Sequence, residues 1–177
     1  MNKVFIATSL DGYIADKAGG IDWLETFPEI NTIDTGYQSF IATIDALVMG
    51  RATYEKVLSF GIEWPYKKPV YVLSNSLSSV PQNMKGKVHL LSGTNNEILS
   101  SIHKNGHKNL YIDGGQVIQN FLKEDLIDEM IITVIPVLLG HGIRLFGKLS
   151  DSLEFHCVST TLYLDKIAQH HYIRNRG

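Results

Sequence analysis

Cysteine is almost absent from this sequence, with Cys157 as its single representative. One thiol forms no internal disulfide framework, and a cysteine-based zinc cluster needs several sulfur ligands. Cys157 lies in the stretch EFHCVSTT, whose composition is typical of a strand. Because free cysteine usually packs as a small apolar residue, we expect a buried, inert thiol there rather than a nucleophile.

Long apolar runs and an excess of positive charge are also missing. No stretch approaches the roughly 20 apolar residues that cross a bilayer, and the first residues lack the pattern of a signal peptide. The formal net charge is −2, so no broad basic surface is available to bind a nucleic-acid backbone by releasing counterions. We therefore expect a cytoplasmic protein that binds neither membranes nor nucleic acids.

The glycine patterns of two common nucleotide-binding folds are absent as well. A doubly wound dehydrogenase carries Gly-x-Gly-x-x-Gly after its first strand, and P-loop nucleotidases carry a Walker loop. Neither pattern occurs in this chain. If a dinucleotide binds, a different arrangement of residues must hold it.

What is present is the composition of an ordinary globular protein, with 177 residues of which 44% are hydrophobic and 19% charged. That length predicts one domain over residues 1–177, with a sizeable core. Apolar patterns indicate strands at 3–9, 45–50, 69–75, 87–93 and 109–113, and helices near 37–44, 54–58, 98–102 and 117–122. This alternation predicts an α/β fold in which helices cover both faces of a mainly parallel sheet.

The last third of the chain changes character. Residues 128–140, 153–164 and 167–175 are strand-like, and no helical pattern separates them. They predict an antiparallel extension at the edge of the sheet. Pro136 lies inside the first of these segments, and it predicts a bulge or an edge position there because proline cannot donate a ladder hydrogen bond.

Three of the expected strands end in residues that suit an anionic ligand. Gly50 is followed by Arg51 and Thr53 at the start of a helix, where free N–H groups and a guanidinium favour phosphate. The segments 72–76 and 114–117 supply hydroxyl and amide groups and a Gly-Gly turn. Each pattern also has a plain structural explanation as a loop, a solvated arginine or a tight turn. Their occurrence at successive strand ends favours a nucleotide-like ligand, because ligands of open α/β sheets gather there.

Five segments in this order resemble the dihydrofolate reductase fold, and within it the reductase domain of riboflavin biosynthesis. They are FIATSLDGYIA, GGIDWL, VMGRATYE, YIDGGQVIQNFL and LIDEMIITVIPVLLGHGIRLF. The resemblance covers nearly the whole chain. It implies a dihydrofolate-reductase-like fold, an oxidoreductase activity and NADPH as the cofactor.

The resemblance also implies roles for individual residues. Those it places against NADPH are Ala7, Ile14, Gly50, Arg51, Thr53, Leu73, Ser74, Asn75, Gly114, Gly115, Gln116 and Val117. Arg51 becomes the candidate partner of the 2′-phosphate, and the Gly114–Gly115 backbone the candidate contact of the pyrophosphate. In relatives this Gly-Gly peptide is often cis, so a cis bond is expected here too.

Three departures from the family pattern bear on the substrate. Asp113 stands where folate reductases have a further glycine, and its charge would repel a pyrophosphate unless the side chain points away. Tyr13 replaces a lysine that riboflavin-type reductases carry after Asp-Gly, which weakens the case for their phosphorylated substrate. The cysteine-rich zinc motif of the accompanying deaminase is missing.

Two carboxylates are candidates for the proton donor. A gapless match to folate reductases places their acidic residue at Asp34, although the same aspartate suits the N-terminal cap of a helix. Asp11, after the first strand, is the second candidate, and a turn residue is its plainer interpretation.

Four further residues are candidates for the substrate pocket. Tyr37, Phe40 and Ile41 form one face of the expected helix, which also suits simple packing on the sheet. Thr133 matches a buried threonine that supports the substrate in folate reductases, although threonine is also a good strand former.

Two functional hypotheses follow. The first is an NADPH-dependent reductase that acts on a small heterocycle of the pterin, folate or aminopyrimidine type. The second is a catalytically silent nucleotide-binding or interaction module of the same fold. We expect no metal, because His170 and His171 are neighbours in a strand and point to opposite faces. The resemblance further implies a homodimer.

Overall fold

The computed structural model describes residues 1–177, the side chain of Asn31 excepted. Its strands are β1 (Asn2–Ser9), β2 (Tyr13–Ala15), β3 (Ala46–Gly50), β4 (Val70–Leu73), β5 (Val88–Leu91), β6 (Leu110–Asp113), β7 (Glu129–Ile135), β8 (Ile143–Arg144), β9 (Phe155–Tyr163) and β10 (Ile167–Arg174). Its helices are α1 (Tyr37–Ala42), α2 (Arg51–Ser59), α3 (Asn95–Lys104) and α4 (Gly115–Lys123), with short 3-10 helices at Asp22–Thr26, Pro28–Thr32 and Gln82–Met84. The elements expected from the sequence are therefore present.

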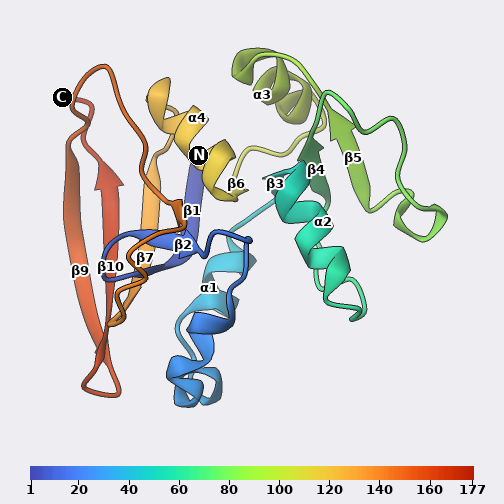
Figure 1. Cartoon of the computed structure of the whole chain (residues 1–177). Helices are drawn as coiled ribbons and strands as arrows, with labels where there is room; N and C mark the ends of the chain where they lie inside the picture. The colour runs from blue at the N-terminus through green and yellow to red at the C-terminus, as the bar shows by residue number, and fades with distance from the viewer.

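One eight-stranded sheet organises the molecule in the order β5-β4-β3-β6-β1-β7-β10-β9 (Figure 1). Neighbouring strands from β5 to β7 run parallel, as predicted. In this register Gly50 pairs with Leu73, and its neighbour Met49 pairs with Asp113. The carboxyl ends of β3, β4 and β6 therefore lie side by side at one edge of the sheet.

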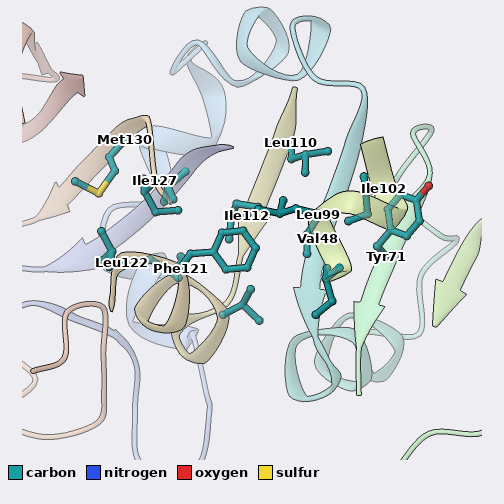
Figure 2. Close-up of a cluster of buried hydrophobic side chains, with 14 of the residues drawn as sticks. Val48, Tyr71, Leu99, Ile102, Leu110, Ile112, Phe121, Leu122, Ile127 and Met130 are labelled. Atoms are coloured by element: carbon teal, nitrogen blue, oxygen red, sulfur yellow. The ribbon is translucent and has the colours of Figure 1, made fainter. Parts of the chain in front are cut away.

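Helices cover both faces of the sheet, as predicted. Apolar residues of α3 and α4 pack on one face in a cluster that includes Ile102, Phe121 and Ile112 (Figure 2). Phe40 of α1 and Tyr54 of α2 belong to a second cluster on the other face. Each helix buries one apolar stripe because residues three and four apart share a face. Within the described residues, every helix is too short or too polar to span a bilayer.

The last third forms the predicted antiparallel extension, in which β10 pairs with both β7 and β9. The prediction for Pro136 is wrong, because β7 ends at Ile135 and lies between two partner strands. Pro136 follows the last residue of β7, so it does not interrupt the hydrogen bonds between the strands. The irregularity of this region occurs instead between His171 and Tyr172 of β10.

The prediction of a buried Cys157 is also wrong. Its side chain is exposed on β9, and its Sγ contacts the backbone oxygen of Ser159 at 3.5 Å. The physical reason is that β9 is the edge strand of the sheet, so fewer neighbours cover it. The strand itself was predicted correctly.

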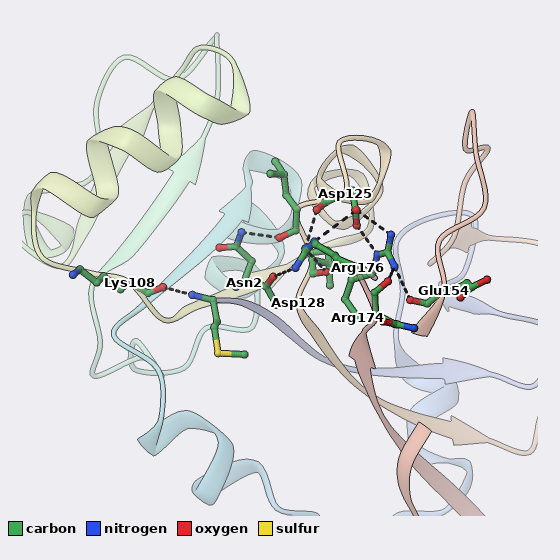
Figure 3. A network of polar contacts seen from close by, with 11 residues as sticks. Asn2, Lys108, Asp125, Asp128, Glu154, Arg174 and Arg176 are labelled. Atoms are coloured by element: carbon green, nitrogen blue, oxygen red, sulfur yellow. Dashed lines mark hydrogen bonds and ion pairs between the residues drawn. The ribbon is translucent and has the colours of Figure 1, made fainter. Parts of the chain in front are cut away.

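A polar network ties the end of the chain to the beginning (Figure 3). Arg174 donates from Nε to Asp125 Oδ1 at 2.6 Å, and Arg176 donates from Nη1 to Asp128 Oδ1 at 2.6 Å. The other carboxylate oxygen of Asp128 accepts the backbone N–H of Asn2 at 2.7 Å. The network therefore joins β10, the turn before β7 and the start of β1.

Candidate functional site

A cavity of about 1240 Å³ opens at the carboxyl ends of the parallel strands. Segments from β1, β2, α2, α4 and the loops after β4 and β5 line it. All of the residues that the sequence placed against a cofactor lie on its wall, namely Ala7, Ile14, Gly50, Arg51, Thr53, Leu73, Ser74, Asn75, Gly114, Gly115, Gln116 and Val117. The structure thus brings together twelve residues from five segments, while their contact with a cofactor stays a prediction.

Arg51 is held in place at the start of α2. Its Nε donates to Glu55 Oε1 at 2.7 Å, and its Nη1 donates to Ser76 Oγ at 2.8 Å. The side chain is 48% exposed, so part of the guanidinium faces the cavity mouth. Ser74 organises the loop that carries Ser76, because its Oγ accepts the N–H of Leu77 at 3.0 Å. The site therefore offers an oriented cation beside a helix N-terminus, which favours a phosphate.

The Gly114–Gly115 turn is required by packing. Gly114 has a φ of 86°, and a Cβ added there would overlap the hydroxyl of Thr53. A Cβ on Gly115 would lie 2.8 Å from Ile14 Cδ1. The expectation of a cis bond is wrong, because this peptide is trans and the positive φ of Gly114 makes the turn. The glycines bring the backbone to the cavity wall at the start of α4.

Asp113 faces the cavity, contrary to the expectation that it points away. Its Oδ1 accepts the N–H of Gly114 at 2.8 Å. Burial raises the pKa of this carboxyl to about 6, since an ionised carboxylate loses hydration there. The side chain is also close enough for its charge to raise the pKa of Tyr66 and Tyr111, for which burial is the larger cause.

Asp11 lies outside the cavity lining and has a structural role. Its carboxylate accepts hydrogen bonds from Ser9 Oγ at 2.6 Å, from Leu139 N at 3.1 Å and from Gly140 N at 2.7 Å. These bonds, led by the one from Ser9, lower its pKa to about 2. A carboxyl that is ionised at neutral pH and occupied by three donors is not suited to donate a proton, so the structure argues against Asp11 as the acid.

Asp34 does not line the cavity either. It is exposed, and its Oδ1 accepts the N–H of Gly36 at 2.8 Å. Helix α1 begins only at Tyr37, with Gly36 as its N-cap. In folate reductases the matched carboxylate is on a helix, whereas here Asp34 precedes α1 and its N-cap. Because this helix is short and starts later, Asp34 belongs to the turn that precedes it.

The four candidate substrate residues belong to the core beside the cavity rather than to its wall. Phe40 is 5% exposed, and Tyr37 packs against Phe5 with ring centroids 5.5 Å apart. Ile41 packs on the same cluster. Thr133 is buried and accepts a hydrogen bond from Gln169 Nε2 at 2.9 Å. The contacts of these four residues are those of packing in the core, which was the plainer of the two interpretations.

Four aromatic residues on the wall were not predicted, namely Phe5, Phe60, Tyr66 and Tyr111. Strand alternation could have indicated Phe5, since it shares a face with Ala7, and likewise Tyr111, which shares a face with Asp113. Tyr66 lies in the irregular segment between α2 and β4, where no periodic pattern predicts the direction of a side chain. Of these rings, Tyr66 and Tyr111 are the ones whose pKa the charge of Asp113 raises, in addition to burial.

Metal-binding clusters are not found among the described residues, where no three His, Cys, Asp or Glu side chains are grouped around a common point. The expectation that no metal takes part stays a prediction.

The sequence and the fold both have relatives. The sequence model of the RibD C-terminal domain matches residues 3–168. The uncharacterized protein YwjB of Bacillus subtilis (strain 168) is 37% identical over 173 residues, which are 97% of this chain and 96% of the relative. The crystal structure of a putative riboflavin biosynthesis protein from Shewanella sp. PV-4 is 53% identical with a TM-score of 0.94, and the match covers 99% of each chain.

The fold extends to more distant proteins. Dihydrofolate reductase from Enterococcus faecalis, solved with NADP(H), superimposes with a TM-score of 0.67 at 18% identity, over 99% of this chain and 96% of that one. At this identity the likeness shows the fold alone. The prediction of a dihydrofolate-reductase-like fold is therefore confirmed.

Proposed function

Because this chain belongs to the RibD C-terminal domain family, we propose that it is an NADPH-dependent reductase of a small heterocycle. Substrates of the pterin, folate or aminopyrimidine type are the candidates. The observation that supports this most is the cavity at the strand ends, whose wall combines a Gly-Gly turn, a helix N-terminus and an oriented arginine. These are the elements that bind the phosphates of a dinucleotide.

The fit of NADPH to this cavity can be judged from the backbone. The hydroxyl of Thr53 occupies the space that a Cβ on Gly114 would need, so glycine lets the main chain come close to α2 at the start of α4. The N–H groups in the first turn of a helix have no partner within the helix, and here they would face the pyrophosphate. Arg51 would bind the 2′-phosphate, and the segment around Ala7 and Ile14 would border the nicotinamide. When bound, NADPH supplies the hydride; the protein positions the ring and excludes water.

We propose Asp113 as the group that holds and delivers the proton. Its Oδ1 is engaged by Gly114 N, which leaves Oδ2 for a substrate nitrogen or oxygen in the cavity. A carboxyl whose pKa is raised to about 6 is partly protonated near neutral pH, and this matches the requirement of a general acid. The rings of Phe5, Tyr66 and Tyr111 would hold a flat heterocycle beside it.

Cofactor binding is tested by titrating the protein with NADPH and with NADH. We expect NADPH to bind at least ten times more tightly, and Arg51→Ala to remove most of that preference. Lys17→Ala is the matched control, because Lys17 also lines the cavity and is an exposed cation in the turn after β2. Equal affinity of the unaltered protein for both cofactors would contradict the role of Arg51.

Turnover separates the reductase from the second hypothesis, a silent nucleotide-binding module. That alternative is favoured by one observation, namely that Asp34 lies outside the cavity. NADPH oxidation is followed with dihydrofolate, dihydropterin and the aminopyrimidine substrate of riboflavin synthesis. We expect turnover with one of them and a loss of about 10²-fold or more in Asp113→Asn, the usual size of a general-acid effect. Tight NADPH binding without turnover on the whole panel would favour the silent module.

A further inference from the structure

A second cavity lies at the other end of the strands. It has a volume of about 590 Å³ and is lined by residues 63–69 together with Gly86 and Lys87. Pro69 directly precedes β4, and Lys87 directly precedes β5. The cavity is therefore located at the amino ends of these two strands, whereas the proposed cofactor site is at their carboxyl ends. We call it the lysine pocket.

The lining of the lysine pocket is strongly positive. Its lining includes three lysines, Lys67, Lys68 and Lys87, and one acidic residue, Glu63. None of the three lysines has an ion-pair partner within the part of the chain that the structure describes. Parallel pairing and the hydrogen bond from Val70 N to Lys87 O at 2.9 Å bring the two lysine-bearing segments together. Lysines that line one pocket without ion-pair partners favour an anion there, because its charge offsets theirs.

An aromatic wall separates the lysine pocket from the main cavity. Trp64 and Tyr66 both line the pocket, and their rings meet edge to face with centroids 5.2 Å apart. Tyr66 also lines the main cavity, where it is close enough to Asp113 for the carboxylate to raise its pKa beyond the effect of burial. One side chain is thus shared by the two cavities.

We propose that the lysine pocket binds a phosphate or carboxylate group. Two sources of the anion are distinguished below, namely the far end of a molecule whose ring occupies the main cavity and a separate small anion. In both cases Lys67, Lys68 and Lys87 supply the charge, and Trp64 and Tyr66 supply the wall. This inference goes beyond the proposed reductase activity and does not depend on it.

Inorganic phosphate is the first probe, with Trp64 as the reporter. The chain has two tryptophans, so Trp23→Phe leaves Trp64 as the only indole. We expect sodium phosphate, titrated at constant ionic strength, to change its fluorescence saturably with a millimolar Kd. Lys67→Ala/Lys87→Ala should weaken binding at least tenfold. Neither substitution touches the core, and circular dichroism with a Tm measurement verifies folding.

Two control variants locate the anion. Lys85→Ala removes an exposed lysine two residues from Lys87 that does not line the pocket, and it should leave the Kd unchanged. Arg51→Ala should also leave it unchanged, because Arg51 lines the main cavity and not the lysine pocket. A fluorescence signal that does not saturate, or a Kd that is the same with and without Lys67 and Lys87, would overturn the proposal.

Calorimetry with folic acid and pterin separates the two sources of the anion. These compounds share a ring, and only folic acid has a long tail that ends in carboxylates. If the tail occupies the lysine pocket, folic acid binding weakens in Lys67→Ala/Lys87→Ala and competes with phosphate, whereas pterin binding is unaffected. If the pocket takes a separate anion, phosphate binds equally well with and without folic acid. The phosphate titration needs neither NADPH nor turnover, so its outcome is independent of the reductase proposal.

Discussion

Asp113 combines two properties that a carboxyl group rarely has together. Its charge acts on Tyr66 and Tyr111 of the cavity wall. The hydrogen bond from Gly114 N does not offset the cost of burial, so the pKa of Asp113 is raised to about 6. The same side chain occupies the turn where the backbone approaches the proposed cofactor. A residue that disfavours its own ionisation in the folded state is expected to lower stability at neutral pH.

Replacing Asp113 by asparagine tests that expectation. The folded pKa lies above the unfolded value of about 3.8, so ionisation destabilises the native protein progressively as pH rises from about 4 to above 6. Asparagine keeps the acceptor for Gly114 N and has no charge. We expect Asp113→Asn to be more stable than the unaltered protein by about 2–3 kcal/mol at pH 7.5, and equally stable near pH 4.

Urea unfolding across this pH range measures the difference in the free energy of unfolding between Asp113→Asn and the unaltered protein. Asp151→Asn provides the control, because that carboxylate is exposed and no shift in its stability difference is expected between the two pH values. A constant difference between Asp113→Asn and the unaltered protein from pH 4 to pH 7.5 would show that Asp113 ionises normally.

At the scale of elements, the turn between β6 and α4 shows how closely α4 approaches α2. The hydroxyl of Thr53 on α2 occupies the space that a side chain at position 114 would need. The first turn of α4 is therefore seated against α2, with Ile14 of β2 above Gly115. Three elements that are distant in sequence meet at this point of the cavity wall.

We expect Gly114→Ala to destabilise the protein by about 2–4 kcal/mol, because it adds a left-handed alanine and a steric overlap. Gly12→Ala is the matched control. Gly12 has a φ of 82° and open space around its Cα, so only the backbone cost of about 1 kcal/mol applies. In the double variant Gly114→Ala/Thr53→Ala, the steric part of the lost stability should be recovered. Thermal unfolding of the unaltered protein, the Gly114→Ala and Thr53→Ala variants and the double variant measures the coupling free energy. Fully additive effects would contradict the contact.

At the scale of the whole molecule, the network in Figure 3 fastens the last strand to the rest of the sheet. Arg174 is only 10% exposed and reaches both carboxylate oxygens of Asp125, at 2.6 and 3.0 Å. Its guanidinium also lies over the ring of Phe155, 5.7 Å from the centroid. Bidentate pairs of this kind are stronger than ordinary surface ion pairs.

Removing Arg174 is expected to reduce the free energy of unfolding by about 1–2 kcal/mol, since it leaves Asp125 with a weaker partner and uncovers Phe155. Arg176→Ala is the control; that side chain is 44% exposed, and we expect a loss of at most about 1 kcal/mol. Urea denaturation gives both values. A larger loss for Arg176→Ala than for Arg174→Ala would contradict this order.

Self-association is a further proposal at this scale. Leu10, Leu138 and Leu162 are 61, 72 and 59% exposed, and the hydrogen bond from Leu10 N to Val137 O places the first two close together. Exposed apolar groups of this kind favour association. We expect a homodimer at micromolar concentration, and Leu138→Asp should shift light scattering towards the monomer mass. A monomeric unaltered protein at that concentration would remove the proposal.

Local patterns were sufficient to predict the elements and the strand ends, and insufficient to predict the roles of single carboxylates. Gly50, Arg51 and Gly114 could be placed on the cavity wall because strand ends of a parallel sheet meet at one edge. The partners of Asp11 lie at Leu139 and Gly140, and no local pattern indicates a contact across that distance in sequence.

The same limit explains the remaining differences. Tyr66 reaches two cavities from a segment without periodicity. Cys157 was expected to be buried because free cysteine usually packs as an apolar residue, and the strand pattern does not reveal which strand of the antiparallel extension is the outermost one. Burial of a strand residue depends on what covers the sheet, and that is decided by the order of strands rather than by the strand itself.

The contacts of Arg51 have a thermodynamic consequence. With Glu55 and Ser76 already holding the guanidinium, its rotamer entropy has been lost during folding, before any ligand arrives. An incoming phosphate then meets a guanidinium whose orientation is already fixed. Differences in affinity between ligands should therefore appear in their dissociation rates rather than in their association rates.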